Sequence, residues 1–349
     1  MRPEVSERVL SERELGRALL ERQSLLARRR VALPAAVERM GGVQAQYAPS
    51  IYLGLWSRVE GLERGQVTRA LERRAIVQAT LLRNTIHVVS PGDYWQFADA
   101  TRESRRASWL QYRAKHGPGS EEVEAAAARM RRRLEDGPAD RKELMPLVDG
   151  DTVLFNGATL WLDVVRVPPA GTWDHRRADI YERAEAWIER ERPDHPVRHT
   201  IARYLAAFGP AAVSDIVSWS GIPLPEIKPE LENMKLRRFR DERGGLLVDL
   251  PRRPLPDAAT KAPVRFLPTW DATLLVHARR TGILPERFRP QVFSTKTPQS
   301  VPTFTVDGQV AGTWREEKGK VTVKPFEPLP KAARREVDEE AARLARFLA

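Results

Sequence analysis

The sequence predicts an α+β protein with three tandem winged-helix units, followed by a β-barrel-like unit and a closing helix. Two observations support this fold class. A succession of helices and a β-hairpin occurs three times, which is the plan of the winged helix, a helix-turn-helix variant. Beyond about residue 258, short strands at barrel-like intervals replace the helices. We place the unit boundaries at 1–118, 119–176, 177–256, 257–327 and 328–349.

The first unit begins with a helix whose start is marked by Ser11 and Glu14, at the spacing of a capping box. A second helix at 34–40 carries Pro at an early position and ends at the pair Gly41-Gly42. Two later β-prone runs can pair as the wing of this unit, 75–80 and 85–89.

The second unit is expected to contain a helix at 121–134 and a short helix at 141–148. Two apolar runs, 152–155 and 159–165, flank Asn156-Gly157. Asn-Gly between such runs is the strongest short signal for a hairpin, so we expect the wing of this unit here.

The third unit is the clearest. Apolar residues at helical spacing and glycine stops predict helices at 197–208, 211–221 and 225–235. Two β-prone runs, 236–240 and 246–250, then flank a glycine-containing turn and predict a hairpin.

The C-terminal part is predicted to contain short strands and one amphipathic helix at 336–348. Asp307-Gly308 gives a hairpin turn of the favoured type. This hairpin can either probe a groove of DNA or simply pack within its own unit. The expected strands are 264–267, 291–294, 303–306, 309–314 and 321–324.

Composition narrows the function classes. The 349 residues include 58 Lys and Arg against 47 Asp and Glu, a net charge of +11, which favours a polyanionic partner, most commonly nucleic acid. A basic enzyme without such a partner is the alternative. The absence of cysteine excludes disulfides, thiolate nucleophiles and Cys-ligated metal centres. With no membrane-length apolar run and no signal-peptide core, we expect a cytoplasmic protein.

Gln44 and Gln46 are the candidate chemical groups. They follow the glycine stop, and in extended backbone side chains at i and i+2 project to the same side. Two amides can then hold a water molecule or read a polar edge without adding charge. The alternative is that both glutamines are ordinary solvated surface groups.

Five motifs occur in order over nearly the whole chain. They are Gly42-Val43-Gln44-Ala45-Gln46 followed by Ser50, Leu82-Arg83-Asn84-Thr85-Ile86-His87-Val88-Val89, Phe208-Gly209-Pro210-Ala211, Leu267-Pro268-Thr269-Trp270-Asp271-Ala272-Thr273-Leu274-Leu275, and Val306-Asp307-Gly308-Gln309-Val310-Ala311-Gly312-Thr313-Trp314. Together they resemble the winged-helix DNA glycosylases of the AlkZ/YcaQ type.

This resemblance implies a concave, basic channel around duplex DNA, built by three winged helices and a β-barrel. It implies hydrolysis of the N-glycosidic bond of alkylated purines, including bulky adducts and interstrand crosslinks, by a monomer without metal or organic cofactor. The family's catalytic motif is Gln-x-Gln in the AlkZ branch, and it falls on Gln44 and Gln46. Asn84 departs from the common Arg-Gly-Thr form, which puts the DNA contact of this turn in doubt.

The residue types fit a restricted chemistry. A purine alkylated at N7 or N3 is cationic and already a good leaving group. Two amides can orient a water molecule and offer dipoles, but they supply neither the charge nor the basicity of a carboxylate. We therefore expect activity on cationic lesions and poor activity on ordinary purines.

Several other residues are candidates for DNA contact. Arg83, Asn84 and His87 flank the first wing. The alternative is that Arg83 is an ordinary surface arginine and that His87 is a hydrogen-bonded histidine at a strand end. Asp271 fits a helix cap better than an auxiliary acid, His277 is expected to be structural, and the pair His195 and His199 lacks the surroundings of a zinc helix. Basic residues suited to phosphate contact in the last part of the chain are Arg279, Arg280, Lys296 and Arg315.

Two rival functions remain open from the sequence. The main one is a non-catalytic winged-helix DNA-binding protein, such as a transcription regulator, in which internal repetition replaces dimerisation. The other is a role without nucleic acid, in which the winged helices merely pack together. The net charge of +11 argues against the second.

Overall fold

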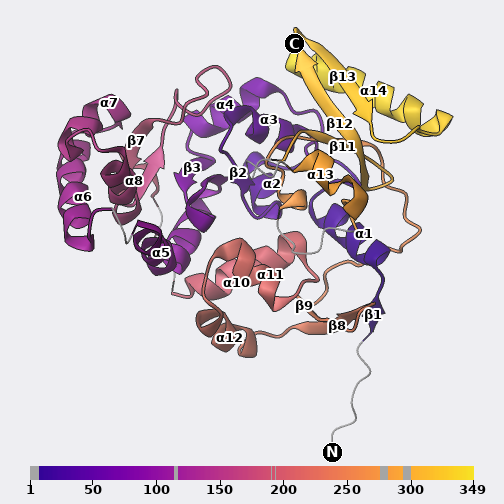
Figure 1. Cartoon of the computed structure of the whole chain (residues 1–349), viewed down its shortest axis with the longest axis horizontal. Helices are drawn as coiled ribbons and strands as arrows, with labels where there is room; N and C mark the ends of the chain where they lie inside the picture. The colour runs from indigo at the N-terminus through magenta and orange to yellow at the C-terminus, as the bar shows by residue number, and fades with distance from the viewer. Residues whose placement is uncertain (1–7, 114–116, 190, 193, 276–281, 294–299) are drawn as a thin grey trace, which may run out of the picture.

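The computed structural model describes residues 8–113, 117–189, 191–192, 194–275, 282–293 and 300–349. Figure 1 shows the second unit (α6 to α8) and the C-terminal unit (β11 to α14) at opposite ends, with the third unit (α10 to α12) below the first. Among the described residues, no helix combines the length and the apolar character that crossing a bilayer requires.

The first unit has the predicted helices and wing. The capping box at Ser11 is formed, because the Ser11 side chain accepts from the backbone of Glu14 and the Glu14 side chain accepts in return. The two wing strands pair in antiparallel register with Thr80 opposite Ile86, which confirms the predicted wing. Its elements are α1 (Glu12–Arg22), α2 (Leu33–Arg39), β2 (Val43–Gln44), α3 (Ala48–Trp56), α4 (Arg64–Glu72), β3 (Val77–Thr80), β4 (Ile86–Val89) and the long α5 (Pro91–Arg113).

The second unit departs from prediction at its wing. The hairpin expected at Asn156-Gly157 is wrong, because both residues lie inside the helix α8 (Thr152–Trp161). The Asp151 side chain accepts from two backbone N–H groups and starts this helix. Gly157 allows close packing: a Cβ there would lie 2.7 Å from the Trp109 ring. The local Asn-Gly signal is thus outweighed by a helix cap and by tertiary packing.

The remaining elements of the second unit are α6 (Ser120–Glu135), β5 (Ala139–Asp140), α7 (Arg141–Leu144), a 3₁₀ helix (Met145–Val148), β6 (Val164–Arg166), β7 (Ile180–Arg183) and α9 (Ala184–Trp187). The true wing is β6 and β7, which pair antiparallel with Val165 opposite Glu182. It lies later in the sequence than the predicted hairpin and carries a long connection, 167–179. Since β7 pairs with β5 and β6, the second unit continues past residue 176, where its end was predicted.

The wings of the first two units join into one six-stranded sheet, with strand order β2-β4-β3-β6-β7-β5. The junction is the antiparallel contact of β3 with β6, where Gln78 faces Arg166. Successive residues alternate between the two faces of a sheet. Gln44, His87 and Ala79 lie opposite one another on β2, β4 and β3, so their side chains share one face of the sheet. The neighbouring cross-strand row, which contains Val43 and Val88, points to the other face.

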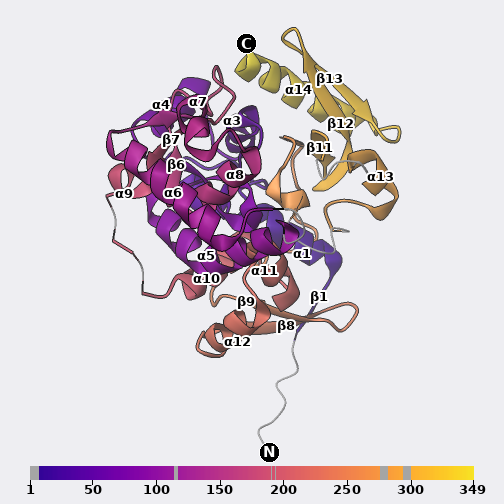
Figure 2. The ribbon, with the colours of Figure 1, turned by 60° about the vertical axis from the view of Figure 1, so that its left-hand side comes forward.

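Each face of this sheet packs on its own apolar core. The face that carries Ala79 and Val165 packs with residues of α5, α10 and α11. The other face, with Val43 and Val88, packs with α3 and with the C-terminal helix. Long α5 contacts both α8 of the second unit and α10 of the third, as Figures 1 and 2 show.

The third unit has the predicted order of helices and hairpin. It contains α10 (Pro196–Phe208), α11 (Val213–Ser220), α12 (Leu224–Glu232), β8 (Arg237–Asp241) and β9 (Leu246–Asp249). Gly221 ends α11 in a left-handed conformation with φ of 76°, as its glycine stop predicts. A short N-terminal strand, β1 (Val9–Leu10), adds to β8 in parallel, which the sequence did not indicate.

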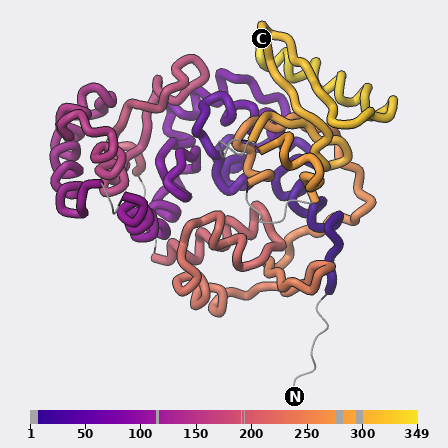
Figure 3. Tube along the Cα trace, viewed as in Figure 1, coloured from indigo at the N-terminus to yellow at the C-terminus, as the bar shows by residue number. Residues whose placement is uncertain are grey.

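The C-terminal unit forms an open sheet. Its elements are β10 (Arg265–Leu267), two 3₁₀ helices (Ala272–Leu274 and Glu286–Phe288), α13 (Arg289–Val292), β11 (Thr303–Val306), β12 (Gln309–Glu317), β13 (Lys320–Pro325) and α14 (Lys331–Leu348). The strand order β10-β11-β12-β13 leaves two edges, so the described strands do not close into a barrel. The chain trace in Figure 3 places α14 alongside β13 at one corner of the molecule.

The strand expected at 291–294 is wrong. Residues Arg289–Val292 are helical, and Pro290 lies in the first turn. Proline is favoured at that place because its fixed φ suits a helix and its missing N–H would be unpaired there anyway. Phe293 forms an isolated bridge to Ser300.

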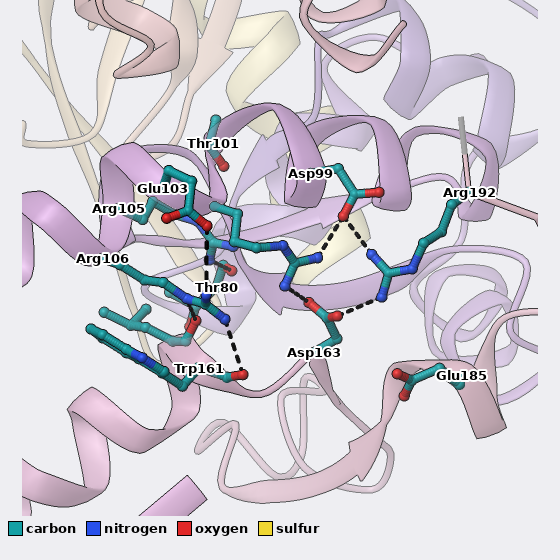
Figure 4. A network of polar contacts seen from close by, with 12 residues as sticks. Thr80, Asp99, Thr101, Glu103, Arg105, Arg106, Trp161, Asp163, Glu185 and Arg192 are labelled. Carbon is teal, nitrogen blue, oxygen red and sulfur yellow. Dashed lines mark hydrogen bonds and ion pairs between the residues drawn. The ribbon is translucent and has the colours of Figure 1, made fainter. Parts of the chain in front are cut away.

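A ring of four alternating charges joins the first two units to the segment that leads into the third. Asp99 and Arg102 lie on α5, Asp163 follows α8, and Arg192 precedes α10, with contacts of 2.5–2.7 Å (Figure 4). Burial alone would raise the pKa of Asp163, but hydrogen bonds to the two arginines and their charges lower it. We call these residues the ion-pair ring.

Candidate active site

Two glycines bring the chain from α2 into β2. Gly41 and Gly42 have φ of 71° and 85°, the left-handed region that glycine adopts without steric cost. A Cβ at Gly41 would lie 2.9 Å from the Phe208 ring, and one at Gly42 would lie 3.2 Å from Val89 Cγ1. The turn therefore needs glycine at these positions, and it fixes where the following glutamines begin.

Gln44 lies on β2 directly opposite His87 of β4, so the two side chains share one face of the sheet. Gln44 is 6% exposed. Its carboxamide forms no hydrogen bond with any described residue, yet it is not sealed from solvent. An amide in this state can still bind a water molecule or a ligand through both its N–H and C=O groups.

The Gln46 side chain already accepts one hydrogen bond within the protein. This side chain is exposed, and its Oε1 accepts from the backbone N–H of Ile86 at 2.8 Å. The neighbouring Ala45 N–H donates to Ile86 O at 2.7 Å, so both contacts extend the pairing of β2 and β4. Within the described part of the chain the Gln46 Nε2 has no acceptor, which leaves its N–H groups for another molecule.

His87 is a buried, neutral imidazole in this site. Its Nδ1 lies 3.0 Å from the carbonyl oxygen of Thr85, which can only accept, so Nδ1 carries the proton. Burial, followed by the positive charge of Arg83, lowers the pKa of His87 to about 3. Its Nε2 is then a lone-pair acceptor, and no described residue donates to it.

Arg83 and Asn84 form a tight 3₁₀ turn between the wing strands. Both are left-handed, with φ of 52° and 57°. The Arg83 guanidinium donates to the backbone oxygen of Trp219 at the end of α11, so it links the first wing to the third unit. Asn84 departs from the glycine common in the family, but asparagine tolerates the left-handed region better than other side chains. Asn84 can therefore adopt the left-handed conformation that this turn requires.

The other residues predicted for DNA contact are placed as follows. Arg315 is exposed on β12 and pairs with Glu317 at 3.2 Å. Arg279, Arg280 and Lys296 lie outside the described residues, as does His277.

The Asp307-Gly308 hairpin packs on α1. Asp307 pairs with Arg13 at 2.7 Å and with the buried Arg17 at 2.6 Å. A Cβ at Gly308 would lie 2.5 Å from the Arg17 guanidinium. The hairpin tip therefore packs against a helix of its own chain, as the packing alternative expects, while the Asp307 side chain stays 47% exposed.

The remaining candidates have structural roles. Asp271 caps a 3₁₀ helix and forms a buried pair with Arg58 at 2.9 Å, which confirms the cap and joins the first unit to the C-terminal unit. His199 bonds Asp93 at 2.7 Å through Nε2. Within the described ranges, no three His, Asp or Glu side chains are grouped as metal ligands would be.

Two residues beside Gln46, Tyr47 and Arg176, were not predicted from the sequence. Tyr47 directly follows Gln46 and is 40% exposed, and the Arg176 guanidinium donates to its hydroxyl at 3.0 Å. Arg176 comes from the 167–179 connection, which is anchored to the first unit where Trp173 N–H donates to Tyr52. The basic and aromatic residues clustered at 173–177 were the available signal, but they lie beyond the predicted wing, at the predicted boundary between the second and third units.

Comparisons with known proteins identify the family and the fold. The chain is 23% identical over 356 aligned positions to an interstrand DNA cross-link repair glycosylase of Streptomyces sahachiroi, with 94% of each protein covered. The solved structure of the DNA glycosylase AlkZ from the same organism superposes with a TM-score of 0.82, at 20% identity and 97% coverage of both chains. That structure has the same fold.

A family model described as DNA glycosylase AlkZ-like matches residues 37–347. The match covers most of the chain and includes the glutamine pair, the first wing and the C-terminal sheet. The protein therefore belongs to the AlkZ-like DNA glycosylase family, whose members are hydrolases that cleave N-glycosyl bonds in DNA.

Proposed function

We propose that this enzyme hydrolyses the N-glycosidic bond of cationic N7- or N3-alkylated purines in duplex DNA, with water positioned by Gln44 and Gln46. The observation that carries the proposal is the Gln44 carboxamide, which reaches solvent without a hydrogen bond to a described residue. Gln46 offers free N–H groups two residues away, and His87 offers a neutral acceptor opposite Gln44. We further propose that the protein acts as a monomer.

The reaction divides between substrate and protein. Alkylation makes the purine cationic, so the C1′–N9 bond breaks with its electron pair going to the base, which leaves as a neutral alkylpurine. Water forms the new bond to C1′ as oxocarbenium character develops there. The amides of Gln44 and Gln46 orient this water and offer their dipoles to the positive sugar.

His87 completes the proposed site as an acceptor. As the water oxygen bonds C1′ it becomes acidic, and Nε2 of His87 can accept its proton before release to solvent. Because the pKa of His87 is about 3, the imidazole is neutral when the substrate binds. The neutral His87 therefore places no positive charge next to the cationic lesion.

Bulky adducts and interstrand crosslinks are proposed as part of the substrate range. The relative with 23% identity is named an interstrand DNA cross-link repair glycosylase. Gln44 lies on β2, the edge strand of the six-stranded sheet, and Gln46 is exposed; an edge position suits lesions that cannot be flipped into a closed pocket.

The test uses duplex DNA with one 7-methylguanine, followed by alkali and detection of strand breaks at abasic sites. We expect product with the wild-type enzyme and none with the double variant Gln44→Ala and Gln46→Ala, while duplex affinity stays unchanged. Gln309→Ala, at an exposed glutamine on β12, is the matched control and should retain full activity. Full excision by the double variant would remove the glutamines from the mechanism.

A second duplex pair extends the test. One carries a defined interstrand crosslink and the other the corresponding monoadduct. Excision of the monoadduct alone would restrict the substrate range to single-strand lesions. Tight sequence-specific binding without any abasic product would instead support a DNA-binding regulator.

A further inference from the structure

A cavity of about 330 Å³ lies between the ends of α1 and α2, the third turn of α10 and the segment after β9. It is about ten times the roughly 30 Å³ that one water molecule takes in liquid water. Two glutamates, Glu21 and Glu38, contribute to its wall. Its other charged side chains are five arginines, Arg22, Arg29, Arg39, Arg203 and Arg253.

Three of these arginines are neutralised by carboxylates. Arg22 forms a fully buried bidentate pair with Asp249 at 2.8 Å. Arg29 pairs with Glu21, and Arg203 pairs with Asp93 at 2.7 Å. The second wall glutamate, Glu38, lies 3.6 Å from Arg203. The carboxylates at the cavity are thus each already held by a guanidinium.

The other two, Arg39 and Arg253, have no carboxylate partner among the described residues. Arg39 Nε donates to Ser24 Oγ at 3.1 Å; the arginine side chain is half-buried and Ser24 is buried. Burial, then the positive charges of Arg22, Arg39 and Arg203, lower the pKa of Arg253. The charge of Asp249 acts in the opposite direction on Arg253, but neither Arg39 nor Arg253 forms an ion pair with a described carboxylate.

Helix ends account for only part of this arrangement. Arg39 lies in the last turn of α2, where a cation favourably meets the negative end of the helix dipole. Arg253 lies outside any helix, in the segment that follows β9. The helix dipole therefore does not explain why Arg253 lies beside three other arginines, whereas an anion bound in the cavity would explain it.

We propose that this cavity binds a phosphate group, held by the guanidinium groups of Arg39 and Arg253. Arginine presents a planar fork of N–H donors that matches phosphate oxygens, and such charge-assisted bonds are the strong ones in proteins. The phosphate can come from the backbone of bound duplex DNA or from a free phosphate ion. Because α2 leads through the Gly41-Gly42 turn into β2, either would brace the start of the strand that carries Gln44.

The test compares the wild type with Arg39→Gln plus Arg253→Gln. The control, Arg132→Gln plus Lys331→Gln, removes the same charge at two exposed positions on α6 and α14. The melting temperature is measured in inorganic phosphate and in chloride at equal ionic strength. We expect phosphate to raise the melting temperature of the wild type and the control above its value in chloride, and to have no such effect on the double variant.

Duplex binding distinguishes the two sources. If the ligand is a backbone phosphate, free phosphate competes with duplex, and the slope of log K against log salt becomes shallower by about 1 in the double variant relative to the control. If the ligand is free phosphate, the melting shift occurs without competition. No phosphate-specific melting shift and no change in slope beyond the control would overturn the proposal.

If the double variant does not fold, Arg253→Gln alone is measured in the same way, because this residue lies in a loop and makes no side-chain hydrogen bond or ion pair with described residues. These binding measurements need no base excision, so their outcome is independent of the role proposed for Gln44 and Gln46.

Discussion

Gln44 and Gln46, the two glutamines proposed to position water, should respond differently to the same substitution. Methionine has nearly the shape of glutamine but lacks the amide, so Gln44→Met and Gln46→Met remove polar groups while keeping volume. The Gln44 amide has no hydrogen bond to a described residue, whereas Gln46 Oε1 accepts from Ile86 N–H at 2.8 Å. Gln46→Met alone should therefore lower the free energy of unfolding, by about 0.5–1.5 kcal/mol for one hydrogen bond.

Activity should fall in both variants. Removing one oriented dipole from a site where charge develops costs about 10²–10³ in rate, or roughly 3–4 kcal/mol of transition-state stabilisation. Gln44→Met is thus expected to lose activity at wild-type stability, and Gln46→Met to lose both. The assays are single-turnover excision of 7-methylguanine and urea unfolding. Equal loss of stability in the two variants, or wild-type excision by Gln44→Met, would refute this division of roles.

Three further predictions concern stability, measured by urea unfolding. The pKa of His87 is about 3 in the folded state and about 6.5 when unfolded, so the unfolded state binds more protons between these values. Stability should decline as pH falls below about 6.5, and His87→Gln should remove that dependence; an unchanged pH profile in this variant would contradict the assignment. Asp271→Ala leaves a buried arginine unpaired and should cost about 3–5 kcal/mol; a loss under about 1 kcal/mol, the value of an exposed pair, would show the pair is solvated. Gly157→Ala should destabilise by about 1–3 kcal/mol against Trp109, although alanine favours helix. Gly65→Ala, which meets only a flexible arginine, is the control, and a stabilised Gly157→Ala would mean that α8 does not pack as described.

The sequence predicted best the elements that carry their own local signals. The third unit follows its glycine stops and its glycine-containing turn closely, and the capping box at Ser11 formed as expected. These features depend on residues within one turn of each other, so no distant contact was needed to recognise them.

The errors arose where distant contacts decide. Asn156-Gly157 has the composition of a hairpin turn, but Gly157 serves to admit the Trp109 ring, which lies 48 positions earlier in the chain. The strand expected at 291–294 failed because Pro290 starts a helical turn. The joining of two wings through Gln78 and Arg166 leaves no local pattern at all.

The candidate site was predictable in part. The motif placed Gln44 and Gln46 together, and His87 was recognised as a neighbour of the first wing. The sequence could not show that Gln46 already uses its oxygen to hold Ile86, nor that Arg176 reaches Tyr47 from the second unit. Both facts depend on strand register and on a long connection, which pairwise spacing does not encode.

The shared sheet limits which parts of this enzyme can move when it takes up a substrate. The first and second units cannot separate without breaking the β3–β6 pairing, and the ion-pair ring crosses the same boundary. The third unit is joined to the first by the parallel β1–β8 pairing and by the contact of Arg83 with Trp219, and the C-terminal unit is joined to the first by the buried Arg58–Asp271 pair. Gln44 lies on this shared sheet, so backbone strand pairing holds its position relative to both the first and the second unit.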